Sequence, residues 1–305
     1  MRMLREVASR GSLAAAAEAL YMTPSAVSQQ MATLEREAGV ALLERSGRSV
    51  RLTPAGERLV EHAERVLAVL EEAQADLVTV AGGGVAGTLR MCAFPTAARA
   101  IMVPAVALLR RQHPRLEPAV SDLEPEESIP MLKVGDMDVV VTYEFDHLPT
   151  PRDPGVERHI LMREPMYIAL PANHPRAEGP VRIADFEKDR WVVGRDGSPF
   201  LEVQVRVSNE AGYNPRIDIH SNDYQVILAA VEAGLGVALV PPLALFAPLP
   251  GVVLRLPEDI EVNRSVTAMI RAGSGGHPSI EAALSALDEV ADQAARRDVS
   301  AYRIV

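Results

Sequence analysis

The sequence predicts an α/β protein that carries an N-terminal all-α module on a long connecting helix. Three observations support this prediction. Short amphipathic helices joined by a tight turn occupy residues 12–39, and a heptad-spaced apolar pattern runs over residues 59–80. After Gly87, runs typical of strand and helix alternate, which predicts a largely parallel sheet. With 305 residues, the chain has room for two or three domains.

Charge is distributed unevenly along the chain. The net charge is −10, yet residues 1–51 hold seven Arg and five Glu, a net charge of +2. The remainder holds 24 basic and 36 acidic residues, a net charge of −12. Such an asymmetry suits a small polyanion-binding module attached to a larger body with another task. Random scatter of charge explains this count equally well.

Composition places the chain in the cytoplasm. No apolar run reaches the ~18 residues that a membrane span needs, and the N-terminus lacks the pattern of a secretion signal. Hydrophobic residues make up 48% of the chain and charged residues 24%, as in ordinary globular proteins. The single cysteine, Cys92, excludes an internal disulfide and a cysteine-based zinc site. We therefore expect a cytoplasmic protein with no membrane contact and no cofactor.

The stretch from Ser12 to Gly39 predicts two helices and a short turn. Ser12 is a suitable N-cap for the first helix, and Thr23 caps the second with Pro24 at its first position. Gly39 suits the helix end. The second helix has an inner face, predicted to be buried, that consists of Val27, Met31, Leu34 and Ala38.

The outer face of this second helix is slim and forms hydrogen bonds. It carries Ser25, Ser28, Gln29, Ala32, Thr33 and Arg36, where a solvated helix usually carries more Glu and Lys. Small side chains allow close approach to a target, and Ser and Gln can contact bases or phosphates. The pattern predicts a DNA-binding helix-turn-helix, with a plain helical hairpin as the alternative.

A basic hairpin is predicted directly after these helices. Residues 41–43 and 50–52 resemble short strands around Ser46-Gly47-Arg48, so they would form a wing. Three arginines give the wing its charge for a DNA backbone or minor groove: Arg45, Arg48 and Arg51. Arginines on a surface turn are common, so each one alone is weak support.

These residues resemble a known family. The stretch from Gly11 to Leu59 is similar to the N-terminal winged helix-turn-helix of LysR-type transcriptional regulators. The matching pieces are Gly11-Ser12-Leu13, Ala16-Ala17, Leu20, Thr23-Pro24-Ser25-Ala26-Val27-Ser28, Leu34-Glu35, Gly39-Val40, Leu43-Glu44-Arg45 and Leu52-Thr53-Pro54-Ala55-Gly56. The family normally has several residues before the position of Met1, so we expect a short first helix with an inner face of Met3, Leu4, Val7 and Ala8. The DNA-contact candidates are Thr23, Pro24, Ser25, Ser28, Gln29, Gln30, Thr33, Arg45, Arg48 and Arg51.

A long helix is predicted from Pro54 to Val80, with Thr53 as its N-cap. Its apolar seam consists of Leu59, Ala63, Val66, Leu70, Ala73, Leu77 and Val80, at alternating spacings of four and three. This regular spacing favours a dimerising helix over one packed on its own domain. The resemblance agrees, because the family pairs through a linker helix. It often forms tetramers, which the sequence neither shows nor excludes.

The resemblance implies a division of the whole chain. Residues 1–58 would form the winged helix-turn-helix and residues 59–84 the linker helix and hinge. LysR-type regulators resemble periplasmic binding proteins beyond this point. Effector subdomain I would then consist of residues 85–161 with 266–297, and subdomain II of residues 162–265. Beyond Gly87 the similarity is one of layout more than of residue identity.

Ligands of open α/β sheets sit at the carboxyl ends of strands, which selects a set of effector-binding candidates. Thr96 opens a helix whose N–H groups suit an anion, and Arg195 suits a carboxylate. The alternative is that these are capping and loop residues, with Ser221 or Asn222 as the natural cap of the next helix. The candidates are Pro95, Thr96, Ala97, Tyr143, Glu144, Arg195, Ser198, His220, Ser221 and Asn222.

Catalytic and metal motifs do not emerge from the sequence. None of the seven His lies in a His-Glu-x-x-His motif, and Asp136 and Asp138 fit a turn better than a metal site. The resemblance implies that the chain binds double-stranded DNA as a dimer, responds to a small molecule and contacts RNA polymerase. The alternative is an enzyme or small-molecule receptor whose N-terminal helices serve only dimerisation.

Overall fold

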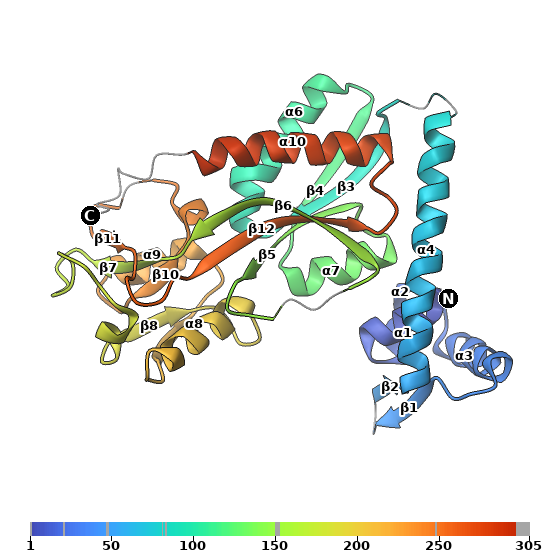
Figure 1. Ribbon diagram of the computed structural model, residues 1–305, viewed down its shortest axis with the longest axis horizontal. Helices are drawn as coiled ribbons and strands as arrows, with labels where there is room; N and C mark the ends of the chain where they lie inside the picture. Colours follow the sequence, from blue (N-terminus) through green and yellow to red (C-terminus); the bar gives the residue numbers. More distant parts are fainter. Residues whose placement is uncertain are drawn as a thin grey trace.

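The computed structural model describes residues 2–20, 22–46, 49–80, 82, 84–149, 153–247 and 249–296. Figure 1 shows a small helical module at one end of a long helix, α4 (Pro54–Val80), and a larger α/β body beside that helix. The body follows the hinge region as two units of sheet and helix. Within the described residues, no helix is long and apolar enough to cross a membrane.

The helical module is built from α1 (Arg2–Arg10), α2 (Leu13–Ala19) and α3 (Pro24–Ala38). Their common core contains Leu4, Val7, Ala16, Ala17, Val27, Met31 and Leu42. The predicted caps are confirmed: the Ser12 hydroxyl accepts a hydrogen bond from the Ala15 N–H, and the Thr23 hydroxyl accepts one from the Ala26 N–H.

The inner face of α3 ends earlier than predicted. Val27 and Met31 are buried and Leu34 is half-buried, but Ala38 is exposed. Ala38 is the last residue of the helix, beyond the part that packs on the core, and Gly39 ends the helix there with a φ of 69°.

The wing consists of β1 (Leu43–Ser46) paired antiparallel with β2 (Ser49–Leu52). Its first strand starts at Leu43, not at Ala41 as predicted. The Glu35 carboxylate of α3 accepts hydrogen bonds from the N–H groups of Leu42 and Leu43, at 2.8 and 3.1 Å. These bonds anchor the chain to α3 where β1 begins, and Leu42 and Ala41 instead accept hydrogen bonds from Thr53, which follows β2.

α4 has the predicted bounds, and Thr53 caps it by accepting a hydrogen bond from the Gly56 N–H. One part of the predicted seam is not free: Ala63 is fully buried within its own chain. From Val66 onward the apolar seam is exposed, reaching 69% at Leu77 and 85% at Val80. The helix therefore packs on its own chain along one side and leaves an apolar side uncovered within the described residues.

The first sheet has five strands in the order β4-β3-β5-β12-β6. The bounds are β3 (Gly87–Ala93), β4 (Leu116–Asp122), β5 (Val139–Phe145), β6 (Val156–Pro165) and β12 (Asn263–Arg271). One side is covered by α6 (Val103–Gln112) and α10 (Pro278–Ala295), and α7 (Pro125–Val134) packs on β5 and β12. A short helix, α5 (Pro95–Ala97), and a π-helical turn, η1 (Ala98–Met102), lead into α6.

This sheet is mixed, so the prediction of a largely parallel sheet is only partly right. β4, β3 and β5 are parallel, whereas β12 is antiparallel to both β5 and β6. The chain returns from the second unit along β12, and this return sets the antiparallel direction. β6 pairs as far as Pro165, so the sheet extends a few residues past the division expected at residues 161 and 266.

The second unit is built around two small sheets. β7 (Tyr167–Pro171) lies antiparallel between β10 (Ala238–Val240) and β11 (Val252–Arg255), and β8 (Arg190–Val193) pairs parallel with β9 (Arg216–His220). The helices are α8 (Pro199–Glu210) and α9 (Tyr224–Glu232), with short turns η2 (Ile183–Phe186) and η3 (Pro242–Ala244). β6 and β12 connect this unit to the first one.

Candidate DNA-binding face and effector cleft

The outward face of α3 is exposed over its first two turns. Thr23, Pro24, Ser25, Ser28, Gln29 and Gln30 are all solvent-exposed, as the sequence predicts for a DNA-contacting surface. Small side chains at the N-terminal turns leave the helix backbone accessible. A helix of this kind fits the width of the major groove, where amide and hydroxyl groups distinguish base edges.

Local hydrogen bonds engage some of these candidates. The Thr23 and Ser25 hydroxyl oxygens lie 3.0 Å apart, so one hydroxyl donates to the other. Thr33 is half-buried, and its hydroxyl donates to the Gln29 carbonyl at 3.0 Å and accepts from Arg36 at 3.0 Å. Gln29 and Ser28 keep their side chains free of the hydrogen bonds described for this face, so they are the better candidates for base contact.

The wing arginines are described unequally. Arg51 is exposed on β2. Arg45 lies on β1, but its side chain is outside the described part of the structure, and Arg48 lies outside the described residues altogether.

A narrow cleft lies between the two α/β units. Its walls come from the turn after β3, the start of α7, β5, the start of α8 and α9, and β12. The cavity has a volume of about 20 Å³, room for one ordered water molecule in this state. Its lining residues are Phe94, Pro95, Thr96, Glu124, Tyr143, Phe200, Asn222, Tyr224 and Arg264.

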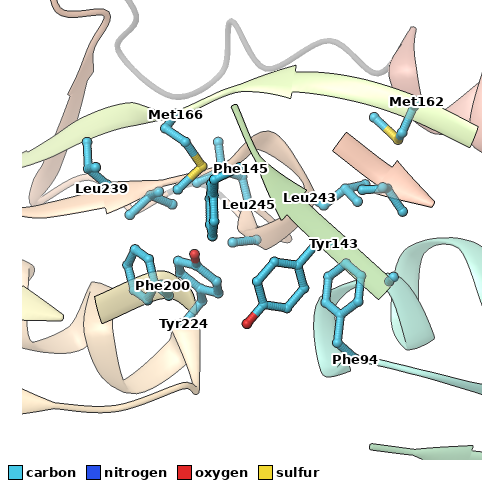
Figure 2. Packing of buried hydrophobic residues seen from close by; sticks show 14 of the residues in the cluster. Phe94, Tyr143, Phe145, Met162, Met166, Phe200, Tyr224, Leu239, Leu243 and Leu245 are labelled. Carbon is cyan, nitrogen blue, oxygen red and sulfur yellow. The ribbon is translucent and has the colours of Figure 1, made fainter. Parts of the chain in front are cut away.

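Four of the predicted effector residues therefore lie together: Pro95, Thr96, Tyr143 and Asn222. Pro95 and Thr96 follow the end of β3, Asn222 follows the end of β9, and Tyr143 lies near the end of β5, so all four are placed at the junction of the two units. Figure 2 shows the rings of Phe94 and Tyr143 on one side of this region and those of Phe200 and Tyr224 on the other. The ring centroids of Phe94 and Tyr143 are 4.8 Å apart, edge to face, and those of Phe200 and Tyr224 are 5.3 Å apart.

The remaining candidates do not line this cavity. Ala97 is fully buried in the core, and Glu144 forms an ion pair with Arg158 at 3.6 Å on the far side of β5. Ser198 caps α8 by accepting a hydrogen bond from the Leu201 N–H. The exposed His220 ring lies 3.1 Å from the Gly194 carbonyl oxygen, measured from Nδ1.

Two loop residues have structural partners instead. The Ser221 hydroxyl accepts a hydrogen bond from the Asp223 N–H, and the Arg195 side chain is exposed while its N–H donates to the Asn222 side chain at 2.9 Å. Neither Ser221 nor Asn222 caps α9: that cap is Asp223, whose carboxylate accepts from the Gln225 N–H. The expected cap lies one or two residues too early, because α9 begins only at Tyr224, after the polar residues that precede it.

Arg264 is the residue of the cleft that sequence reasoning missed. Its side chain is 2% exposed and pairs with the equally buried Glu164 at 2.6 Å, a partner directly opposite on β6. The guanidinium lies 5.0 Å from the Phe94 ring centroid and 3.5 Å from the Thr96 hydroxyl. Burial opposes its charge, yet the carboxylate of Glu164 keeps the pKa of Arg264 above its usual range. The sequence signal that could have revealed this pair was one charged residue in each of two strands, Glu164 in β6 and Arg264 in β12.

Glu124 adds a titratable group to the cleft. Burial, assisted by the charge of Glu126, raises the pKa of its carboxyl to about 7, while Arg264, Tyr143 and Arg195 oppose the shift. Burial also raises the pKa of the Tyr143 and Tyr224 hydroxyls, so both stay protonated. The cleft thus offers one fixed cation, hydroxyl donors and one carboxyl that changes charge near neutral pH.

Comparisons with known proteins agree over most of the chain. Residues 1–57 match the family model of the bacterial regulatory helix-turn-helix protein, lysR family, and residues 82–292 match that of the LysR substrate binding domain. The transcriptional dual regulator GltC of Bacillus subtilis is 27% identical, over 87% of this chain and 88% of its own length. The enzyme alternative is set aside, because the similar proteins are transcriptional regulators.

Solved structures show the same arrangement. A mutant OxyR of Corynebacterium glutamicum, in an H2O2-bound form, has a TM-score of 0.60 and 26% identity, covering 96% of this chain and 92% of its own. Full-length CbnR in complex with its target DNA has a TM-score of 0.54 and 25% identity, covering 97% and 98%. Matched in both of its modules, the chain belongs to the LysR family, as a transcriptional regulator with a helix-turn-helix DNA-binding domain and an effector-binding domain.

Proposed function

We propose that the outward face of α3 reads operator DNA while the cleft of the α/β body binds the small molecule that controls the regulator. The observation that carries this proposal is the exposed row of Ser25, Ser28, Gln29 and Gln30 on a helix whose other face is buried. Arg51 of the wing, and Arg45 and Arg48 beside it, would contact the flanking DNA backbone.

Pairing of two chains would set the DNA site. The exposed side of α4 carries Val66, Val69, Leu70, Leu77 and Val80, which are 47–85% exposed. Apolar surface of this length on one helix favours a partner helix, and a two-fold dimer reads two half-sites. Leu70→Glu with Leu77→Glu should dissociate the dimer in sedimentation experiments, whereas Val226→Glu, an exposed valine on α9, should leave it intact. A dimer that survives the leucine changes contradicts pairing through α4.

The effector would bind between Arg264, Thr96, Tyr143, Asn222 and Tyr224. A cavity of about 20 Å³ is too small for a metabolite, so binding requires that the two units separate. The ligand shifts the hinge only through its different affinity for the two states. Metabolites that raise the melting temperature of the full chain identify the effector, since a ligand of the native state stabilises it.

Thiol oxidation is a poor alternative as the signal. Cys92 is buried, and burial raises the pKa of its thiol to about 11. Its reactive thiolate is therefore scarce at neutral pH. A chain with one cysteine also forms no internal disulfide.

The same proposal includes the division of the chain into domains. The winged helix-turn-helix would be residues 1–58, the linker helix and hinge 59–84, effector subdomain I 85–161 with 266–297, and effector subdomain II 162–265. A homotetramer, contact with RNA polymerase and a cytoplasmic location follow from the way such regulators act at promoters.

A mobility-shift assay tests the DNA-reading role. The probe is a fragment selected from a randomised pool by the full-length protein. Gln29→Ala should weaken binding to this fragment but not to unrelated DNA, because it removes one base contact. Gln112→Ala, an exposed glutamine at the end of α6, is the matched control and should change neither. Equal affinity of the Gln29 variant and the wild type would count against the assignment.

A further inference from the structure

α4 carries a second stripe besides its exposed apolar seam. Glu64, Ala68, Glu71 and Ala75 recur at spacings of four, three and four, so they lie on one face of the helix. Each of them meets the α/β body of the same chain. The Glu71 carboxylate pairs with Arg271, and the other three residues lie against glycines of two loops.

Glycine permits close approach at two of these contacts, Gly155 and Gly273. A side chain at Gly155 would lie 2.5 Å from the Glu64 carboxylate, and one at Gly273 would overlap the Ala68 carbonyl. Gly273 also has a φ of +84°, which side chains rarely adopt. At Gly276, a Cβ atom would lie 4.0 Å from that of Ala75. The turn between β12 and α10 is therefore shaped to lie against α4.

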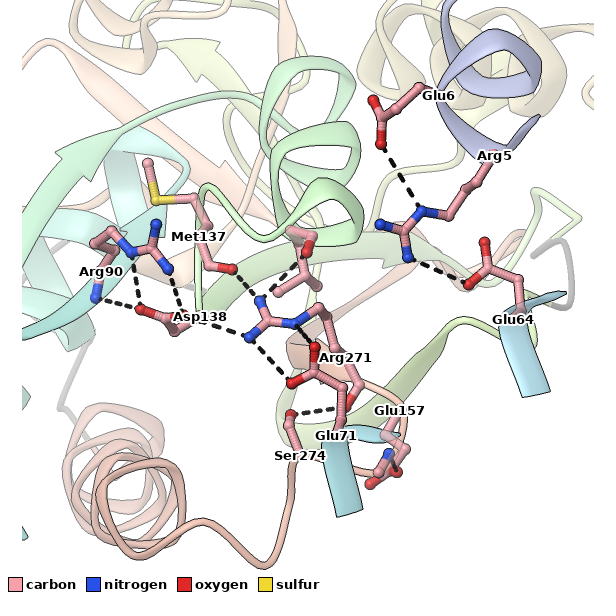
Figure 3. Close-up of polar contacts among 12 residues, drawn as sticks. Arg5, Glu6, Glu64, Glu71, Arg90, Met137, Asp138, Glu157, Arg271 and Ser274 are labelled. Carbon is pink, nitrogen blue, oxygen red and sulfur yellow. Dashed lines mark hydrogen bonds and ion pairs between the residues drawn. The ribbon is translucent and has the colours of Figure 1, made fainter. Parts of the chain in front are cut away.

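Arg271 is the centre of this contact, as Figure 3 shows. Its Nε donates to Glu71 Oε1 at 3.1 Å, and its Nη1 donates to the Met137 carbonyl at 2.6 Å. Nη2 lies 3.5 Å from Asp138 Oδ1. Arg271 thus joins α4 to the start of β5 through one side chain.

The contact is polar and incompletely packed. Cavities of about 230 and 300 Å³ lie on either side of the Arg271–Glu71 pair, and both are lined largely by polar side chains. The Glu71 side chain is 25% exposed and that of Arg271 is 14% exposed, so water reaches the pair. A polar, incompletely packed interface inside a chain favours relative motion of its two sides.

The same strands reach the effector cleft. β12 carries Arg264 at its cleft end and Arg271 at its α4 end. Asp138 directly precedes β5, which carries Tyr143 at the cleft. The two strands are paired from Arg264↔Phe145 to Ile270↔Val139, so a continuous hydrogen-bonded ladder joins the cleft end to the α4 end.

We propose that the Arg271–Glu71 pair and the glycine turn beside it form a latch through which the cleft sets the angle of α4 and its DNA-binding module. The latch rests on the proposed function, in which the cleft binds an effector and α3 binds DNA. A closed latch fixes α4 against the α/β body, and an open latch releases it. The two states therefore present the paired α3 helices to DNA at different angles.

An engineered disulfide tests the latch in the full chain. Ala75→Cys with Gly276→Cys places two Cβ atoms at a separation of 4.0 Å, within the range of about 3.5–4.5 Å that a disulfide needs. The buried Cys92 does not compete. Glu71→Lys opens the latch by placing two positive charges together, and Glu72→Lys, an exposed neighbour on the same helix, is its matched control.

The readout is the bend of an end-labelled, pool-selected DNA fragment, measured by energy transfer, together with its affinity. We expect the DNA bend angle of the oxidised disulfide form and that of Glu71→Lys to lie on opposite sides of the wild-type angle. The DNA affinities of these two forms should differ by about 5- to 150-fold. Reduction should return the disulfide form to the wild-type bend, and Glu72→Lys should match wild type.

The latch is overturned if the disulfide fails to form under oxidising conditions, or if the oxidised, reduced and Glu71→Lys forms bend DNA equally. Failure of the proposed function is a different result, because no form, wild type included, would then prefer the selected fragment over unrelated DNA.

Discussion

The proposed DNA-binding face of α3 and the proposed effector cleft are built in opposite ways. The α3 face comes from one helix, and its polar side chains are exposed with few partners. The cleft comes from six segments of the chain, and the ion pair between its Arg264 and Glu164 is 2% exposed on both sides. The proposed function therefore predicts that a substitution on the outer face of α3 changes DNA binding alone, whereas one at the ion pair beside the cleft also changes how stably the chain folds.

Among the variants that test this contrast, Arg264→Met should cause the largest change, a loss of unfolding free energy. It leaves the Glu164 carboxylate buried without its partner, which typically costs about 3–5 kcal/mol of unfolding free energy. Urea unfolding of the full chain measures the loss. Glu164→Leu added to Arg264→Met removes the orphaned charge and should recover part of it. A single variant as stable as wild type would mean that the pair is not buried in solution.

Ser28→Ala should show the reverse behaviour. We expect DNA discrimination to fall by about 0.5–1.5 kcal/mol if the hydroxyl makes one hydrogen bond to a base. The free energy of unfolding should stay within about 0.5 kcal/mol of wild type, because the side chain is exposed. Parallel titration with selected DNA and with urea separates the two quantities. A large loss of stability with unchanged DNA affinity would break the contrast.

The free energy of unfolding should depend on pH through Glu124, the titratable carboxyl of the cleft. Its folded pKa of about 7 lies above the usual 4.5, so the folded state holds a proton that the unfolded state has released between these values. Stability should therefore fall as pH rises from 4.5 to 7, with a slope no steeper than about 1.4 kcal/mol per pH unit from this group. Glu124→Gln should flatten the profile of unfolding free energy against pH. An unchanged profile in the variant would remove Glu124 from the account.

Arg51→Ala should have the smallest effect. A phosphate contact from the wing strengthens binding to all DNA sequences alike, so its loss should lower the slope of log affinity against log salt by about one and leave sequence preference intact. Binding isotherms at several salt concentrations measure the slope. A changed sequence preference would instead assign Arg51 to a base or a groove.

Local patterns made the DNA-binding module and the helix order predictable. Caps such as Ser12 and Thr23 and the heptad spacing of α4 act within a few turns of chain, so the sequence contains their cause. Sheet direction is not local: β12 returns from residues far along the chain, and its antiparallel course had no signal in its own residues. The expected ends of two strands identified Thr96 and Tyr143 as cleft candidates. This was possible because a residue's position near the end of a strand can be inferred from the local sequence.

Arg264 and Glu124 were missed for a related reason. Each sits among apolar or helical residues, and each matters only because distant segments bring a partner or a wall to it. The charge of Arg264 is meaningful beside Glu164, a hundred residues earlier in the chain. Pairing of this kind arises only when β6 and β12 come together in the fold.

Sequence preference measured base by base tests the central claim most directly. DNA would be selected from a randomised pool by the wild-type protein and, separately, by the Gln29→Ala variant. If the outer side of α3 reads bases, the variant should lose preference at one base pair in each half-site and keep it elsewhere. Identical preferences for both proteins at every position would contradict that claim.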